Sequence, residues 1–152
     1  MPQDAEVQKI LSRYRTVAVV GLSRDQSKDS YLVAERLKKE GFKIIPVNPF
    51  AEEILGEKCY KSLLEMPEKI QKTIEVVDIF RPAEEVMSIV HEAIQLKEKF
   101  GKPHVIWMQL GIINEEAAKT AEKAGLIVVM NKCIMQEYRR LFAKADLRTP
   151  QI

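Results

Sequence analysis

The sequence predicts an α/β fold: a doubly wound parallel sheet of five strands with helices on both faces. Two observations support this class. Short runs of β-branched residues alternate with helical patterns of apolar residues along the whole chain. The first run, TVAVVG at residues 16–21, is almost entirely β-branched and ends in glycine, as in a parallel strand covered on both faces. The 152 residues have the size of one ordinary domain, so we expect a single domain over residues 1–152.

The first half of the chain alternates between helix and strand. Apolar residues recur at helical spacing near the N-terminus, which predicts a helix within residues 1–15 that packs on the sheet. After the first strand, a helix is predicted over 31–40, because Gly41 is a typical helix stop. FKIIPVNP at 42–49 predicts a second strand that is closed by two prolines. A short excursion with a small helix near Ser62 is expected next.

The second half continues the alternation. Pro82 suits a helix start, and the apolar residues after it recur at helical spacing until Gly101. Asn114, followed by two glutamates, is typical of a helix N-terminus. The elements expected here are a strand at 74–80, a helix at 82–100, a strand at 104–109, a helix from Asn114 to Gly125, a strand at 126–130, a helix from about residue 134 and a C-terminal tail at 144–152.

This alternation implies right-handed crossovers, and we expect the strand order 3-2-1-4-5. In such sheets, ligands bind beyond the carboxyl ends of the strands, beside the point where the strand order reverses. With this order, that point lies between the first and fourth strands. The functional residues are therefore expected at this edge of the sheet.

Composition excludes several classes of protein. The 24 basic and 22 acidic residues nearly cancel to a net charge of +2, which argues against a nucleic-acid partner. The N-terminus has no signal-peptide pattern and no apolar run approaches membrane-spanning length, so we expect a cytoplasmic protein without a membrane partner. Cys59 and Cys133 lack metal-ligand spacing, and neither a zinc site nor a disulfide framework is expected.

The loop after the first strand combines a glycine backbone, hydroxyl groups and cations ahead of a helix N-terminus. This combination suits a phosphate group. The loop matches neither GxGxxG nor the phosphate-binding P-loop pattern, and a solvated turn with incidental charges is the alternative. The candidate residues of this loop are Gly21, Leu22, Ser23, Arg24, Lys28, Ser30 and Tyr31.

The second strand ends in Val47, Asn48 and Pro49. A dinucleotide-binding domain for NAD usually places an acidic residue here, to accept hydrogen bonds from the ribose hydroxyls. Asn48 can bond a base or a ribose, and the rigid backbone beside it offers an apolar wall for an adenine. A simple strand terminator is the alternative. The missing acid counts against NAD.

The remaining strand ends add polar and cationic groups. Arg81 follows the third strand, Gln109 and Gly111 follow the fourth, and Lys132 and Cys133 follow the fifth. Cations at these ends favour an anionic ligand such as the phosphates of a nucleotide. No catalytic constellation is present: His91 falls on a helix and His104 precedes the fourth strand at the opposite edge.

Six ordered blocks resemble a known family over nearly the whole chain: TVAVVGLSR, IIPVNP, ILGEKCYKSL, VDIFRPAEEV, HVIWMQLGI and GLIVVMNKC. They are similar to the small CoA-binding domain proteins, stand-alone counterparts of the N-terminal CoA-binding domain of the succinyl-CoA synthetase α subunit, which have a Rossmann-like fold. The resemblance implies that the loop after the first strand meets the phosphates and that residues 47–49 lie by the adenosine. Arg81, Gln109 and Gly111 would complete the floor.

The leading hypothesis is therefore non-catalytic binding of coenzyme A or an acyl-CoA, as a carrier or sensor. Many relatives have Asp-Arg-Cys where this chain has Asn131, Lys132 and Cys133, so the thiol is kept and the charge altered. A mixed disulfide between Cys133 and the CoA thiol is a sharper variant. The alternatives are an NAD(P)-dependent oxidoreductase and a regulatory module that senses CoA or ADP. A homo-oligomer or an acyl-CoA enzyme is the expected partner.

Overall fold

The computed structural model describes the backbone of residues 1–148 and the side chains of residues 1–142. Its centre is a five-stranded, wholly parallel sheet, which confirms the predicted fold class. The strands at Val76–Ile79 and Val105–Met108 are buried at all four of their residues, as expected where helices cover both faces of a sheet. The strands are β1 (Thr16–Val20), β2 (Lys43–Val47), β5 (Val76–Ile79), β6 (Val105–Met108) and β7 (Ile127–Met130).

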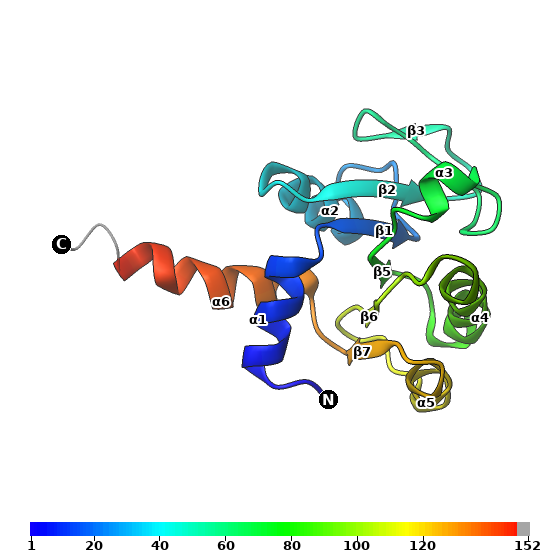
Figure 1. Ribbon diagram of the computed structural model, residues 1–152. Helices are drawn as coiled ribbons and strands as arrows, with labels where there is room; N and C mark the ends of the chain where they lie inside the picture. The colour runs from blue at the N-terminus through cyan, green and yellow to red at the C-terminus, as the bar shows by residue number, and fades with distance from the viewer. Residues whose placement is uncertain (149–152) are drawn as a thin grey trace.

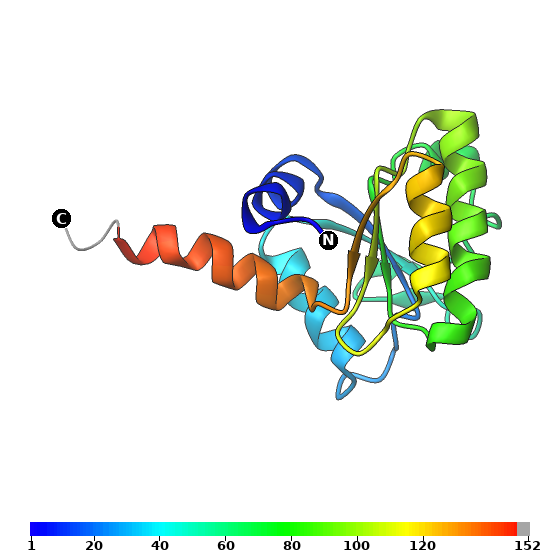
Figure 2. The same cartoon turned by 90° about the horizontal axis from the view of Figure 1, so that it is seen from below.

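Helices cover the sheet in two layers, which Figures 1 and 2 show from two directions. The first layer holds α4 (Ala83–Phe100) and α5 (Glu115–Lys123), and the second holds α1 (Asp4–Arg13), α2 (Asp29–Lys39) and α6 (Ile134–Arg148). Successive strand residues face opposite layers: Ala18 of β1 belongs to the core under α4 and α5, whereas Val17 belongs to the core under α1, α2 and α6. Helix α6 runs well into the stretch expected as a tail at 144–152, whose last four residues lie outside the described part.

The strand order is β2-β1-β5-β6-β7. The predicted pattern 3-2-1-4-5 appears when the chain at Tyr60, which makes one parallel bridge to Val47 on the outer side of β2, is counted as the third strand, and β7 then adds a sixth strand. The strand predicted at 74–80 therefore takes the fourth place, beside β1. A single bridge is too short to produce a strand pattern in the sequence, so the sequence itself predicts no strand at Tyr60. The strand order reverses between β1 and β5.

The segment between β2 and β5 differs from the prediction. It holds a two-stranded antiparallel hairpin, β3 (Glu53–Ile54) and β4 (Glu57–Lys58), and its small helix α3 lies at Glu68–Gln71 rather than near Ser62. Pro46 lies inside β2 instead of closing it. With only the Tyr60 bridge outside it, β2 is almost an edge strand, where a missing backbone N–H is tolerated.

The helix boundaries follow the predicted capping signals. The side-chain oxygen of Asn114 accepts a hydrogen bond from the backbone N–H of Ala117 at 2.9 Å, which caps α5. Gly101 ends α4 in a left-handed conformation with φ 79°. Asn114 therefore fixes where the chain enters α5, and Gly101 fixes where it leaves α4 toward β6.

Gly21 joins the end of β1 to both neighbouring strands. Its backbone N–H donates to the carbonyl of Val47 at 2.9 Å. Its φ is +92°, and a β-carbon placed on it would lie 2.9 Å from the carbonyl oxygen of Phe80 and 2.8 Å from Cδ of Arg81. Only glycine meets both constraints, so the turn after β1 and the end of β5 can touch at the point where the strand order reverses.

We predict that Gly21→Ala lowers the free energy of unfolding by roughly 1–3 kcal/mol more than Gly111→Ala does, because the added methyl group must push backbone atoms apart. Gly111 is the matched control: its φ is +86°, but a β-carbon there would have no atom within 4 Å. Chemical denaturation of both variants measures the difference. Equal losses would show that the close approach of Gly21 to Phe80 carries no cost.

Asp78 places a carboxyl group in the middle of the sheet. It lies on β5 between Val19 of β1 and Trp107 of β6, and it is fully buried. Neither carboxyl oxygen has a hydrogen-bond partner, and burial raises the pKa of Asp78 well above its usual range. The folded protein therefore holds Asp78 protonated at pH values where the unfolded chain ionises it.

This difference in pKa makes stability depend on pH. The unfolded chain releases the Asp78 proton above about pH 4, so wild-type stability falls as the pH rises from there toward the folded pKa. Asp78→Asn keeps the shape and removes the titration. We predict that the Tm of the variant minus that of the wild type increases from pH 4 to pH 8, as measured by calorimetry. A difference that does not change with pH would contradict the buried, protonated carboxyl.

Candidate functional site

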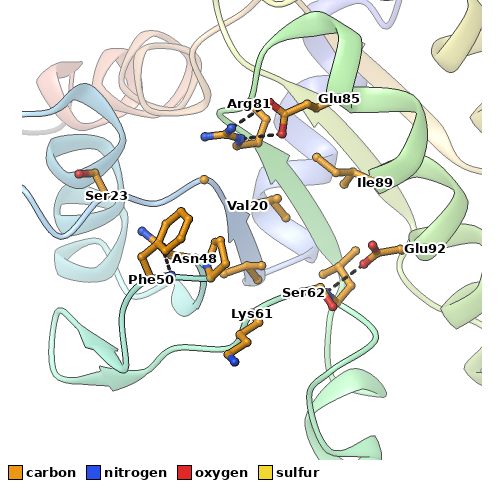
Figure 3. Close-up of a pocket in the computed structure, with 14 residues that line it drawn as sticks. Val20, Ser23, Asn48, Phe50, Lys61, Ser62, Arg81, Glu85, Ile89 and Glu92 are labelled. Atoms are coloured by element: carbon orange, nitrogen blue, oxygen red, sulfur yellow. Dashed lines mark hydrogen bonds and ion pairs between the residues drawn. The ribbon is translucent and has the colours of Figure 1, made fainter.

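A cavity of about 360 Å³ opens at the carboxyl ends of β1, β2 and β5. Figure 3 shows its walls: Asn48 and Phe50 come from the loop after β2, Arg81 from the loop between β5 and α4, Glu85 from the first turn of α4, and Lys61 from the loop that follows the hairpin. The cavity therefore lies beside the reversal of the strand order, where this class of sheet binds ligands.

Six of the predicted site residues line this cavity. They come from three separate loops that the parallel sheet brings to one edge. The loop after β1 supplies two, the end of β2 supplies three, and the residue after β5 supplies the cation. They are Gly21, Ser23, Val47, Asn48, Pro49 and Arg81.

Other predicted residues of the β1 loop hold it in shape rather than line the cavity. The hydroxyl of Ser30 accepts a hydrogen bond from the backbone N–H of Ser23 at 2.9 Å, and it is buried. The side-chain amide of Asn48 donates to the carbonyl of Leu22 at 2.9 Å, and Leu22 itself is a core residue. Arg24 reaches across to the β2 loop. Asn48 thus ties the loop after β1 to the loop after β2.

Lys28 and Tyr31 lie just beyond the cavity, at the start of α2. Lys28 occupies the N-cap position, and no side chain caps the helix there. Tyr31 is partly buried against the core under α2. The N–H groups at this helix N-terminus have no side-chain cap, and such groups suit an anion.

Arg81 is paired with an acidic neighbour. Its Nε donates to Oε1 of Glu85 at 3.1 Å and its Nη2 donates to Oε2 at 2.8 Å. Both side chains are 45% exposed. A pair this exposed contributes about 0–1 kcal/mol, so an anionic ligand can compete with Glu85 for the guanidinium group.

Glu92 ties helix α4 to the loop at the far end of the cavity. Its Oε1 accepts a hydrogen bond from the backbone N–H of Leu63 at 3.1 Å. Burial raises the pKa of Glu92, and hydrogen bonds from the backbone of Leu64 and Leu63 partly offset this effect. The carboxyl group thereby fixes the wall formed by residues 61–63.

Sequence reasoning missed eight residues of the cavity. Glu85, Ile89 and Glu92 lie four and three positions apart on one face of α4, and this spacing after a strand end was a usable signal. The loop residues had no such signal, because a single bridge at Tyr60 brings them to the edge of the sheet. The missed residues are Val20, Phe50, Lys61, Ser62, Leu63, Glu85, Ile89 and Glu92.

The ends of β6 and β7 do not line this cavity, so Gln109 and Gly111 lie outside it. Gln109 is buried, and its side-chain oxygen accepts a hydrogen bond from the backbone N–H of Ile134 at 3.0 Å. The N–H of Gly111 donates to the side-chain oxygen of Asn131 at 2.7 Å. Both groups hold the loops after β6 and β7 together and are not part of the floor of the cavity.

Lys132 and Cys133 also lie apart from the cavity. The carbonyl of Lys132 accepts a hydrogen bond from Nε1 of Trp107 at 2.7 Å, which ties this loop to the buried core. Cys133 is 8% exposed and lines a separate hollow between α2 and α6. The loop after β7 therefore leads away from the cavity, toward the opposite layer of helices.

The cavity combines two kinds of surface. Val47, Leu63 and Ile89 form apolar walls that suit a flat ring, whereas the guanidinium group of Arg81 suits a phosphate group. Among the described residues, no group of three or more His, Cys, Asp or Glu side chains could hold a metal ion. None of the helices in the described part is long and apolar enough to cross a membrane.

Comparison with known proteins agrees with this geometry. The chain is 36% identical to the uncharacterized protein YneT of Bacillus subtilis over 133 residues, which cover 88% of this chain and 92% of that protein. A hypothetical protein from Pyrococcus horikoshii has the same fold, with a TM-score of 0.83, 41% identity and 92% of each chain covered.

A third relative is an enzyme. Over 83 residues, the chain is 40% identical to the ADP-forming acetate–CoA ligase II of Archaeoglobus fulgidus, a match that covers 53% of this chain and 12% of the enzyme. The sequence model of the family described as a CoA binding domain matches residues 15–139. The chain therefore belongs to the CoA binding domain family.

Proposed function

We propose that the protein binds coenzyme A, or an acyl-CoA, in the cavity at the carboxyl ends of β1, β2 and β5, without catalysing a reaction itself. One observation carries this proposal: in a chain of the CoA binding domain family, a cavity with apolar walls opens between Gly21 and Arg81, where the strand order reverses. The adenosine lies between the apolar walls. The pyrophosphate lies between the loop after β1 and the guanidinium group of Arg81.

The size of the cavity indicates which part of the ligand it holds. Cavities that enclose a whole drug-sized ligand measure roughly 300–1,000 Å³, and this one, at about 360 Å³, is near the lower limit. Coenzyme A is longer than such a ligand, so only its nucleotide end fits. The pantetheine arm and any acyl group then extend outside the cavity, and the site accepts free CoA and acyl-CoA alike.

The end of β2 favours CoA over NAD. Asn48 lies where an NAD site usually has an acidic residue. Its side-chain N–H donates to the carbonyl of Leu22, and its side-chain oxygen accepts a hydrogen bond from the backbone N–H of Phe50 at 2.7 Å. The carboxylates of the cavity come from α4 instead, and Glu85 is already paired with Arg81. No carboxylate at the end of β2 is therefore free to accept the hydroxyls of an NAD ribose.

The biological role of CoA binding is inferred from the part of its relatives that this chain matches. The ligase named above is an enzyme of which this chain matches 12%, so we expect the chain alone to bind CoA without ligating it. This expectation agrees with a carrier that passes CoA to an acyl-CoA enzyme, or with a sensor that signals to such an enzyme whether CoA is bound. We expect the protein to be located in the cytoplasm, where thiols such as those of CoA and Cys133 are kept reduced.

A mixed disulfide between Cys133 and CoA is the covalent variant. It is less favoured, because the Cys133 thiol is buried and lines the hollow between α2 and α6 instead of the nucleotide cavity. Reversible, non-covalent binding needs no rearrangement of this segment.

We predict that calorimetric titration of the nucleotide-free protein shows tighter binding of CoA and acetyl-CoA than of NAD.

Arg81→Met should weaken CoA binding roughly 10-fold, because a charge-assisted hydrogen bond to phosphate is lost. Glu85→Gln should leave the affinity unchanged or raise it by up to about 5-fold, because Arg81 is released from its acidic partner.

Cys133→Ser is the matched control and should bind CoA as the wild type does, with or without reductant. Binding of NAD in preference to CoA would overturn the assignment of the ligand. Loss of CoA binding in Cys133→Ser, together with an adduct of CoA mass on the wild type under non-reducing conditions, would replace the non-covalent account with the mixed disulfide.

A further inference from the structure

Phe50 is the most exposed large apolar side chain among the described residues. Its relative exposure is 83%, and it follows Pro49 directly after β2. It also lines the nucleotide cavity, at the end that Figure 3 shows beside Asn48 and Ser23. A phenyl ring in water at the rim of a cavity makes no contact with the core, so it is free to contact a ligand held in the cavity.

The backbone of Phe50 is held on both sides, although its ring is free. Its N–H donates to the side-chain oxygen of Asn48 at 2.7 Å, and its carbonyl accepts from Nη1 of Arg24 at 3.4 Å. The same Asn48 side chain donates to Leu22, so the position of Phe50 is coupled to the loop after β1. The backbone of Phe50 is therefore fixed at the rim, and only the side-chain rotation of its ring has to be restricted when the ring closes over a ligand.

The groups around the ring indicate what it would cover. The cavity behind it has the apolar walls Val47, Leu63 and Ile89, and Arg81 supplies a cation at another side. A flat aromatic group between such walls, linked to an anion, is the chemistry of a purine nucleotide. Aromatic side chains stack on the face of a purine without requiring hydrogen bonds to the base.

We propose that Phe50 closes the cavity over the base of the bound nucleotide and is a binding residue for the adenine of CoA. This inference rests on the proposed function and adds to it a residue that discriminates ligands with a purine base from those without one. Phe50 then contributes to the affinity for CoA and contributes nothing to the affinity for 4′-phosphopantetheine, which has the arm and a phosphate but no base.

Titration of Phe50→Ala against both ligands tests this. We expect CoA to bind roughly 5- to 30-fold more weakly than to the wild type, since loss of base stacking on an aromatic residue has effects of this order. The affinity for 4′-phosphopantetheine should not change. Leu110→Ala is the matched control, because Leu110 is 60% exposed, does not line the cavity and should leave both affinities unaltered.

A second variant reports contact directly. In Phe50→Trp, the new indole is on the surface, whereas the chain's own tryptophan, Trp107, is completely buried. Stacking on adenine should quench the fluorescence of the variant when CoA is added, and CoA should not quench the wild type. Titration with 4′-phosphopantetheine should quench neither protein.

The outcomes separate this inference from the proposed function. If the wild type binds CoA but Phe50→Ala binds it within twofold as well, or the indole of Phe50→Trp is not quenched, the base-stacking role is wrong and the proposed function stands. If the wild type does not bind CoA at all, the proposed function fails and this inference fails with it.

Discussion

The close contact between Gly21 and the end of β5 is the constraint on which the site depends. In a parallel sheet, the loops after β1 and β5 leave in opposite directions at the point where the strand order reverses, and the space between them becomes a crevice. Because Gly21 has no side chain, its backbone lies against Phe80 and Arg81, and its N–H still reaches Val47. The three strand ends are thereby fixed to one another, and the cavity walls inherit this geometry without any contribution from a ligand.

Polar contacts between loops extend this rigid frame outward. The Asn48 side chain joins the loops after β1 and β2, and Glu92 joins α4 to residues 61–63. What remains adjustable is the exposed edge: the Arg81–Glu85 pair and the ring of Phe50. A fixed apolar interior with an adjustable charged and aromatic rim is an efficient way to bind a nucleotide, because little conformational entropy is lost in ordering the walls. Asp78, buried in the same sheet with no hydrogen-bond partner for either carboxyl oxygen, lowers the stability of this frame.

The strands, helices and caps were largely predictable, because each has a local signal such as a β-branched run, an apolar stripe or Asn114 at a helix start. The pairing of β1 with β5 was not predictable, since the sequence of a buried apolar strand carries no information about which strand lies beside it. For the same reason, the candidates after β1, β2 and β5 came together, whereas Gln109, Gly111 and Cys133 did not. Those residues follow β6 and β7, which β5 separates from the point of reversal. Phe50 has no periodic pattern around it, and only its exposure beside a cavity distinguishes it from an ordinary loop residue.

Amide chemical-shift mapping by NMR during addition of CoA tests the central claim most directly, because it reports where the ligand sits as well as whether it binds. The account predicts that the largest shifts occur at residues 21–24, 47–50 and 61–63 and at Arg81, and that the α2–α6 hollow beside Cys133 is little affected. Saturable shifts confined to that hollow, or no shifts at all with CoA, would contradict a nucleotide site at the carboxyl ends of β1, β2 and β5.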